Sequence, residues 1–198
     1  MEGVSVGEDG IVRCAWGGTS EIYRRYHDEE WGRPVHGDDA VFERLTLEAF
    51  QSGLSWLTIL RKREAFRAAF AGFVIHQVAG FGPADAERLM ADPGIVRNRA
   101  KIAATIGNAR AAAQLLEREG DGALDRLLWS HRPSRERAPS DPVPAATAES
   151  AALARDLKRE GFVFVGPTTA YAAMQATGVV NDHVPGCHLS LPAGSGRR

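Results

Sequence analysis

The sequence predicts an all-α protein, and three observations support this fold class. Apolar residues recur at the three- and four-residue spacing of a helix in several segments, which Gly and Pro separate. Only one stretch, GFVFVG at 161–166, reads as an extended run, and it is too short to imply a sheet. No apolar run approaches the ~18 residues that a membrane-spanning helix needs.

Six helices are expected along the chain. Their approximate ranges are 38–53, 55–70, 84–92, 98–119, 147–160 and 168–177. Asp38 and Asp39 can cap the first helix, and Pro83 suits the first position of the third. Gly161 and Gly178 end the last two helices. The fourth helix has the clearest buried face, formed by Ile102, Ile106, Ala109, Ala113 and Leu116.

The chain length is sufficient for one domain with its own core, because 198 residues can bury a large apolar surface. We therefore expect residues 1–198 to form a single domain, with loose tails at 1–12 and 188–198. Residues 131–146, HRPSRERAPSDPVPAA, are rich in Pro, Ser and Arg. This composition predicts a surface loop.

The charge balance excludes a protein that coats nucleic acid through bulk charge. Lys and Arg number 24, Asp and Glu number 25, and the net charge is −1. Proteins of that class carry a clear basic excess, although acidic residues elsewhere could offset a small basic face here. The N-terminal segment MEGVSVGEDG is acidic and lacks the apolar core of a signal peptide. We therefore expect a cytoplasmic protein that does not bind a membrane.

Cysteine and histidine residues suggest a metal site. His183 and Cys187 lie four residues apart in NDHVPGCH, where Pro-Gly lets the chain turn and aim both side chains at one point. Cys14 and His27 provide a second pair. Two thiolates and two imidazoles would form a closed, structural zinc site. The alternative is two buried cysteines with unrelated histidines, and His188 is a competing ligand.

A helical hairpin is predicted for residues 88–101, RLMADPGIVRNRAK. The start of its second helix would expose backbone N–H groups, which bind a phosphate regardless of base sequence. Its Arg and Lys side chains add local positive charge. The candidate DNA-binding residues are Gly94, Ile95, Arg97, Arg99 and Lys101. The alternative is an ordinary hairpin with a solvated basic face.

Aromatic residues and one carboxylate gather in the first third of the chain. They are Trp16, Tyr23, Tyr26, Trp31, Glu48 and Trp56. Glu48 lies at the edge of the apolar stripe of its helix, where a carboxylate is costly unless it meets a partner or lines a cavity. Aromatic rings with one carboxylate suit a flat cationic ligand. The alternative is that the Trp and Tyr residues belong to the core.

Taken together, these segments resemble the DNA-3-methyladenine glycosylase I family, the constitutive bacterial members of the helix-hairpin-helix superfamily. The matching stretches are RCAW at 13–16, YHDEEWG at 26–32, LTLEAFQSGLSW at 45–56, GIVRNRAKIAATIGNA at 94–109 and GFVFVGPTTAYAAMQATGVVNDHVPGC at 161–187. They keep the family's order and cover most of the chain from Arg13 onward. The first dozen residues and the 131–146 loop match poorly.

The resemblance assigns roles to the candidate residues. The family's zinc ligands correspond to Cys14, His27, His183 and Cys187. Its lesion pocket corresponds to Tyr26, Glu48 and Trp56, with Trp16 nearby, and its hairpin corresponds to the turn at 93–97. The family lacks the catalytic aspartate found in many relatives, and we assign none. Ala49 and Phe50 replace the Gly-Gln often found there, and their extra bulk could reshape one pocket wall.

The implied activity is base-excision repair: hydrolysis of the N-glycosidic bond of 3-methyladenine in alkylated double-stranded DNA. Glu48 would be the catalytic carboxylate, and structural zinc the only cofactor. We expect a monomer. The alternative is a non-catalytic module that recognises damaged DNA with the same pocket. A zinc hydrolase is disfavoured, because four protein ligands leave no open position for a catalytic water.

Overall fold

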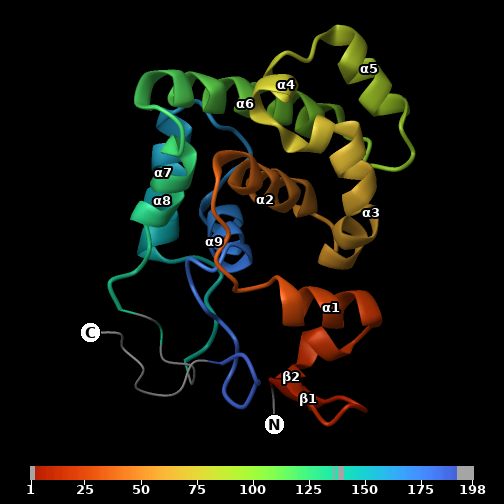
Figure 1. The fold of residues 1–198 in the computed structure, drawn as a ribbon, viewed down its shortest axis with the longest axis vertical. Coiled ribbons are helices and arrows are strands. Elements are labelled where there is room, and N and C mark those ends of the chain that lie inside the picture. The colour runs from red at the N-terminus through yellow and green to blue at the C-terminus, as the bar shows by residue number, and fades with distance from the viewer. Residues whose placement is uncertain (1–2, 136, 138–140, 191–198) are drawn as a thin grey trace.

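The computed structural model describes residues 3–135, 137 and 141–190, and within them the protein is mostly helical (Figure 1). The α-helices are α1 (Glu21–Glu29), α2 (Asp38–Gln51), α3 (Trp56–Ala69), α4 (Ile75–Ala79), α5 (Pro83–Ala91), α6 (Arg99–Glu119), α7 (Ala123–Ser130), α8 (Ala148–Arg159) and α9 (Pro167–Ala176). Two short 3-10 helices are η1 (Ala15–Gly18) and η2 (Ala71–Phe73). Strands β1 (Val4–Val6) and β2 (Val12–Cys14) pair antiparallel, with Val4 opposite Cys14.

Helices form in all six predicted segments. Residues 161–166 contain no strand, in agreement with the expectation that this run is too short to imply a sheet. Phe164 has a φ of +60°, and the side-chain amide of Asn108 bonds both backbone groups of Val163, at 2.8 and 3.0 Å. Residues 1–12 are not simply a loose tail, since they include β1 and the start of β2. The described part of the predicted 131–146 loop contains no helix or strand, since α7 ends at Ser130.

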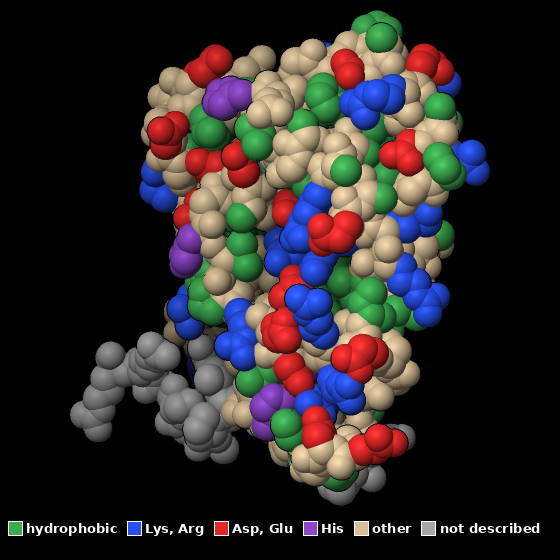
Figure 2. Space-filling model, turned by 45° about the vertical axis from the view of Figure 1, so that its right-hand side comes forward, with side chains coloured by type: hydrophobic (Ala, Val, Ile, Leu, Met, Phe, Trp, Pro, Cys, Tyr) green, Lys and Arg blue, Asp and Glu red, His purple; other side chains and the backbone are tan. Residues whose placement is uncertain are grey.

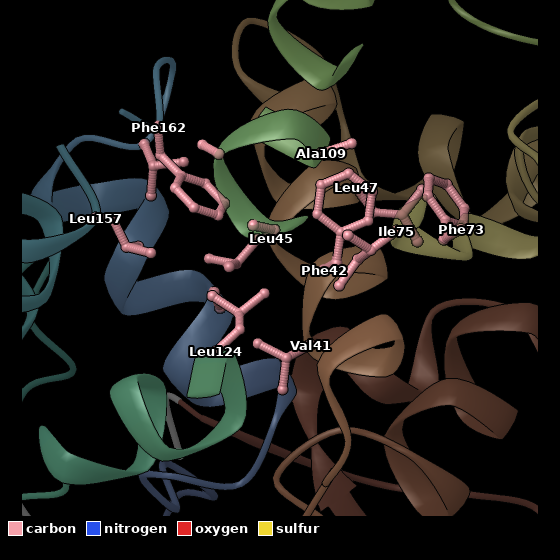
Figure 3. Close-up of a cluster of buried hydrophobic side chains, with 14 of the residues drawn as sticks. Val41, Phe42, Leu45, Leu47, Phe73, Ile75, Ala109, Leu124, Leu157 and Phe162 are labelled. Atoms are coloured by element: carbon pink, nitrogen blue, oxygen red, sulfur yellow. The ribbon is translucent and has the colours of Figure 1, made fainter. Parts of the chain in front are cut away.

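Helix α2 lies at the centre of the hydrophobic core. Its side chains Val41, Phe42 and Leu47 are completely buried, and Figure 3 shows them within the cluster of core side chains. Around them converge buried residues of the other helices and connecting segments: Phe73, Ile75, Ala109, Leu124, Leu157 and Phe162. Because α2 is enclosed in this way, the polar residues that it carries are also held in fixed positions.

The two aspartates expected to cap α2 cap other elements instead. Gly37 is the N-cap residue of α2, and Asp38 and Asp39 occupy its first turn. Asp38 accepts hydrogen bonds from the amides of Gly122, Leu124 and Asp125, at 2.6–3.1 Å, and thereby joins α2 to the start of α7. Asp39 accepts one from Ile75 at the start of α4, at 2.8 Å.

Segments from opposite ends of the chain lie side by side. After α9 the chain runs back toward β2 and α1, at the bottom of Figure 1. The amide of His188 donates to the carbonyl of Val12 at 2.8 Å. The described residues 188–190 are therefore not a loose tail, and the rest of the predicted tail, 191–198, lies outside the described residues.

The surface carries charges of both signs. On the face shown in Figure 2, Lys and Arg side chains alternate with Asp and Glu side chains. This agrees with the near-zero net charge. Among the described residues, no helix combines the length and hydropathy that crossing a bilayer demands.

Candidate functional site: a metal centre and an aromatic pocket

The structure brings Cys14, His27, His183 and Cys187 together, and all four are buried. Their ligand atoms lie within 4.8 Å of one another. The Cys187 Sγ atom is 3.4 Å from His27 Nε2 and 3.5 Å from His183 Nδ1, which in turn is 3.6 Å from the Cys14 Sγ. His188, the competing ligand, is outside this group, and its Nδ1 lies 3.0 Å from the Val12 carbonyl oxygen.

The outward-facing nitrogens of both histidines have acceptors. His27 Nδ1 lies 2.8 Å from the Asp28 carboxylate, and His183 Nε2 lies 3.2 Å from the Trp31 carbonyl oxygen. Asp28 is held in turn by three contacts from the Arg13 guanidinium, at 2.7–3.0 Å. Such outer partners fix the orientation of imidazoles that bind metals. The other ring nitrogens, His27 Nε2 and His183 Nδ1, therefore point toward the cysteine sulfurs.

The protonation behaviour of the group suits a cation. Burial raises the pKa of the Cys14 thiol to about 12. Burial, with a smaller contribution from the neighbouring His27, lowers the pKa of His183 to about 4. The imidazole is therefore neutral and able to ligate, while a cation would be needed to hold the thiolate. The donor set and the burial both fit a structural zinc ion.

Gly32 allows a close approach at this centre. Its φ of +74° lies in the left-handed region, and a Cβ atom there would be 3.1 Å from His183 Nε2. The glycine of the YHDEEWG segment therefore lets the chain turn beside the histidine.

A cavity of about 470 Å³ lies next to the metal centre, within the size range of ligand sites. Five elements contribute to its walls: η1, α1, α2, α3 and α9. The lining residues are Trp16, Thr19, Tyr23, Tyr26, Trp31, Glu48, Gln51, Trp56, Ala172 and Gln175. All four residues predicted for the lesion pocket are therefore brought together here.

The aromatic walls are packed against one another. The Tyr26 ring centroid lies 5.4 Å from that of Trp56 and 6.3 Å from that of Trp16. The Trp16 ring also contacts Trp31 edge-on, at 5.0 Å. Tyr23 ties α1 to α3, because its hydroxyl accepts a hydrogen bond from the Leu57 amide at 3.0 Å. The rings thus support one another in the wall of the cavity.

Glu48 supplies the carboxylate of the pocket. Its residue is 6% exposed, and among the described residues its side chain forms no hydrogen bond or ion pair. Burial raises its pKa to about 8, and the positive charge of Arg44 partly opposes this shift. A buried carboxylate without a partner is costly, so its position is explained better by a ligand than by stability.

The sequence did not indicate the contribution of α9. Ala172 and Gln175 line the cavity, but they lie more than one hundred residues after the aromatic group. Gln175 is oriented by a hydrogen bond of 2.8 Å from its amide nitrogen to Asp182, which is itself buried. A polar residue among the small and apolar side chains of α9 was the available signal.

Ala49 and Phe50 do not form a pocket wall. Phe50 is fully buried and packs on Phe66, with ring centroids 4.7 Å apart, and on Phe70 at 6.0 Å. Neither Ala49 nor Phe50 is among the lining residues. The extra bulk at these positions is therefore taken up by the core.

The predicted hairpin consists of α5, the turn at 92–98 and the start of α6. In the turn, the Gly94 amide bonds the Asp92 carboxylate at 2.7 Å, and Ile95 is buried. Arg97 is exposed and makes no ion pair or hydrogen bond with other described residues. Arg99 is also exposed, but Glu87 accepts hydrogen bonds from its guanidinium at 2.6 and 3.3 Å.

Lys101 has a different role from the one that the sequence suggested. It is 9% exposed, and its ammonium group donates to the carbonyls of Phe50 at 2.9 Å and Ser52 at 2.6 Å. These carbonyls lie at the end of α2 and in the turn that leads to α3. Lys101 is therefore buried against this turn rather than presented to a DNA backbone.

Comparisons with known proteins agree with this architecture. The methyladenine glycosylase family model matches residues 16–190. DNA-3-methyladenine glycosylase 1 of Escherichia coli K12 is 46% identical, over 89% of this chain and 96% of its own length. The DNA-3-methyladenine glycosylase of Haemophilus influenzae is 42% identical over the same shares.

Solved structures show the same similarity. A crystal structure of 3-methyladenine DNA glycosylase I superposes with a TM-score of 0.83 at 43% identity, covering 90% of this chain and all of that one. A structure that describes 3-methyladenine recognition by the Staphylococcus aureus enzyme gives 0.81 at 34% identity, covering 89% and 95% of the two chains. The extent and identity of these matches show that the chain belongs to the methyladenine glycosylase family.

Proposed function

We propose that this protein is a base-excision repair glycosylase that hydrolyses the N-glycosidic bond of 3-methyladenine in alkylated double-stranded DNA. The observation that carries the proposal is the aromatic pocket with the unpaired Glu48 carboxylate in its wall. Family membership supports it, because the relatives named above carry that activity in their names.

The chemistry demands little acid or base assistance. A purine methylated on a ring nitrogen is cationic, so its bond to the sugar is already weakened and the base leaves as a neutral molecule. The protein must turn the nucleotide out of the duplex, hold the base and admit water to the sugar. Tyr26, Trp16 and Trp56 offer ring faces that attract a flat cation.

In this reaction Glu48 is the catalytic carboxylate, and its role is electrostatic. Its oxygen accepts a hydrogen bond from the exocyclic amine of the base, and its negative charge balances the charge of the lesion. The same charge stabilises the oxocarbenium-like sugar that develops as the bond breaks. The leaving base needs no proton, and the water that adds to the sugar releases its proton to solvent.

We assign duplex binding to the helix-hairpin-helix motif formed by α5 and α6. The turn residues Gly94 and Ile95 bring the start of α6 to the surface, where backbone N–H groups can hold a phosphate. Arg97 is the available cation of this region, and Arg99 can join it by exchanging Glu87 for a phosphate. Lys101 does not take part in this contact, because its ammonium group is held by the carbonyls of Phe50 and Ser52.

Structural zinc is proposed for the group of Cys14, His27, His183 and Cys187. Bound there, the ion would cross-link both ends of the domain, and with four protein ligands it would not activate water. The metal centre lies behind the pocket: the Trp16 ring is 5.2 Å from the His27 ring and also lines the cavity. We further propose that the protein acts as a cytoplasmic monomer.

Release of free base separates an enzyme from a non-catalytic module that recognises damaged DNA. The purified protein is incubated with methylated duplex DNA, and the released bases are identified by chromatography. We expect free 3-methyladenine to accumulate with time, and the Glu48→Gln variant to release it more slowly. Tight binding of methylated DNA without release of any base would instead favour the recognition module.

A further inference from the structure

We propose that Arg44, held by Glu30, is a positioning residue that favours the ionised form of the Glu48 carboxylate needed by the lesion, an inference that rests on the role proposed above for Glu48. Arg44 has no place among the pocket-lining residues and would act through Glu48 alone. The inference concerns three charged residues, Arg44, Glu30 and Arg63, which we call the Glu30 cluster.

Helix geometry places Arg44 next to Glu48. The two residues are one turn apart on α2, so their side chains share a face of the helix. The Arg44 side chain is 11% exposed, and its Nη2 donates to Glu30 at 3.1 Å. Its Nη1 is buried and has no hydrogen-bond partner among the described residues. One face of α2 therefore holds a buried N–H and a buried carboxylate, neither of which is hydrogen-bonded.

The guanidinium of Arg44 cannot easily turn away, because Glu30 is itself fixed. Arg63 on α3 donates two hydrogen bonds to the Glu30 carboxylate, at 2.6 and 2.8 Å. Glu30 follows directly after α1, so the cluster joins three elements that also build the pocket. Such bidentate pairs are the most rigid form of ion pair.

The cluster has a net positive charge, since two guanidinium groups share one carboxylate. The positive charge of Arg44 lowers the pKa of Glu48, in opposition to burial. Tyr26, on α1, also faces Glu48, and burial together with Glu48 raises its pKa, so the phenol stays neutral. The pocket side chains from η1, α3 and α9 (Trp16, Thr19, Trp56, Ala172 and Gln175) are uncharged.

Glu30 also limits the cost of placing a cation behind the pocket. An isolated Arg44 would repel a cationic purine, whereas a guanidinium paired with Glu30 has part of its charge offset. Glu48 is ionised only in part at neutral pH when its pKa is about 8. The Glu30 cluster thus sets how much of the carboxylate is available at a given pH.

The test compares pH profiles of 3-methyladenine release by full-length variants. Arg44→Met should move the acidic limb of the profile to higher pH by about one unit, the lower end of the shift caused by a nearby opposite charge. Glu30→Gln should move it in the opposite direction, because an offsetting negative charge is lost. Arg44→Lys should stay close to the wild type. Loosened packing would not move the acidic limb in opposite directions in the Arg44→Met and Glu30→Gln variants.

Arg67→Met is the matched control. Arg67 also joins α3 to α2, through Glu43 at 2.9 Å, but neither residue lines the pocket. Its loss should leave the acidic limb in place. The ionisation of Glu48 is measured directly as well, from the ¹³C shift of its carboxyl group during a pH titration of each folded variant.

Two outcomes would overturn the proposed role of Arg44, and a third would instead overturn the role of Glu48. An Arg44→Met profile and Glu48 titration that superpose on the wild type overturn the inference. If Arg44→Met does not fold, an unchanged Glu48 titration in Glu30→Gln overturns it equally. If instead Glu48→Gln retains the acidic limb and full activity, the proposed role of Glu48 itself is wrong.

Discussion

Glu48 lies in the pocket wall with its carboxylate out of contact with any hydrogen-bond donor of the described residues. A buried carboxylate without a partner lowers the stability of the folded protein, because it has lost its hydration. An incoming amine or cation removes part of that cost. Two measurable consequences follow at the scale of this residue, one for the reaction and one for stability.

Glu48→Gln keeps the shape of the side chain but loses its charge. We expect transition-state stabilisation to fall by roughly 1.5–3 kcal/mol, the range for a hydrogen bond to a charged group. This corresponds to about ten- to more than a hundredfold in the rate of 3-methyladenine release. The wild type should release 7-methylguanine far more slowly, because that base presents a carbonyl in place of the amine, and the Gln variant should narrow this ratio. Equal wild-type rates for the two bases would remove Glu48 from base recognition.

The same substitution should stabilise the protein in a pH-dependent manner. Because the pKa of Glu48 in the folded protein is about 8, above its ordinary value of 4.5, the wild type loses stability as pH rises from about 4.5 through 8. The Gln side chain does not titrate, so the Glu48→Gln variant does not lose this stability. The difference in free energy of unfolding between variant and wild type should therefore be absent near pH 4.5 and largest above pH 8. An upper bound is about 5 kcal/mol, at ~1.4 kcal/mol per pKa unit. Thermal unfolding at pH 5 and pH 8.5 checks this; a constant difference would contradict it.

Among the structural elements, the helices with apolar periodicity or with Pro and Gly at their ends were predictable, whereas α1, α4 and α7 were not. Helix α6 satisfies the helical spacing over its whole length. Helix α1 is only nine residues long and buries only Tyr26 and His27, which belong to the pocket and to the candidate metal ligands. Helix α7 is eight residues long, and its start is fixed by Asp38, a partner distant in sequence.

The pocket residues also divide into those that the sequence indicated and those that it did not. Its aromatic residues and Glu48 are close enough in sequence to be recognised as a group, and the family resemblance supplied their roles. Gln175 was not found, because only the packing of α9 beside α2 brings it there. The burial of Lys101 could not be predicted either, since a basic residue at the start of a helix has the same local sequence whether it contacts DNA or a neighbouring turn.

The start of α6 offers a paired test, because Arg97 and Lys101 have similar charge and different surroundings. Arg97→Glu should weaken binding to undamaged and damaged duplex alike, without altering lesion preference. Lys101→Met should instead destabilise the fold by about 1–3 kcal/mol, since two carbonyls lose their donor.

Salt dependence distinguishes the two roles. Each lost phosphate contact should reduce the slope of log K against log salt by about 0.9. We expect this reduction for Arg97→Glu and none for Lys101→Met, measured by fluorescence anisotropy with a labelled duplex. A reduced slope for Lys101→Met, with unchanged thermal stability, would restore Lys101 to the DNA interface.

At the scale of the whole molecule, the candidate metal ligands bring together residues from near the two ends of the chain. Cys187→Ala should lose zinc and lower the melting temperature, since the ligand set closes a loop from Cys14 to Cys187. Any folded variant should retain some activity, because Glu48 and the turn proposed to bind DNA lie on other elements. Metal analysis and thermal unfolding test both statements, and carefully purified wild-type protein without stoichiometric zinc would contradict the assignment.

The separation of these ligands along the chain also governs when the centre can form during biosynthesis. Translation delivers Cys14 and His27 first, and the ribosome must add more than one hundred and fifty residues before His183 and Cys187 exist. A nascent chain can therefore offer an ion only half of its ligands, however much of the helical core has already folded. If zinc binds as proposed, its loading would be one of the last steps in the maturation of this protein, and a cell short of zinc would accumulate chains that are fully synthesised but not cross-linked between Cys14 and Cys187.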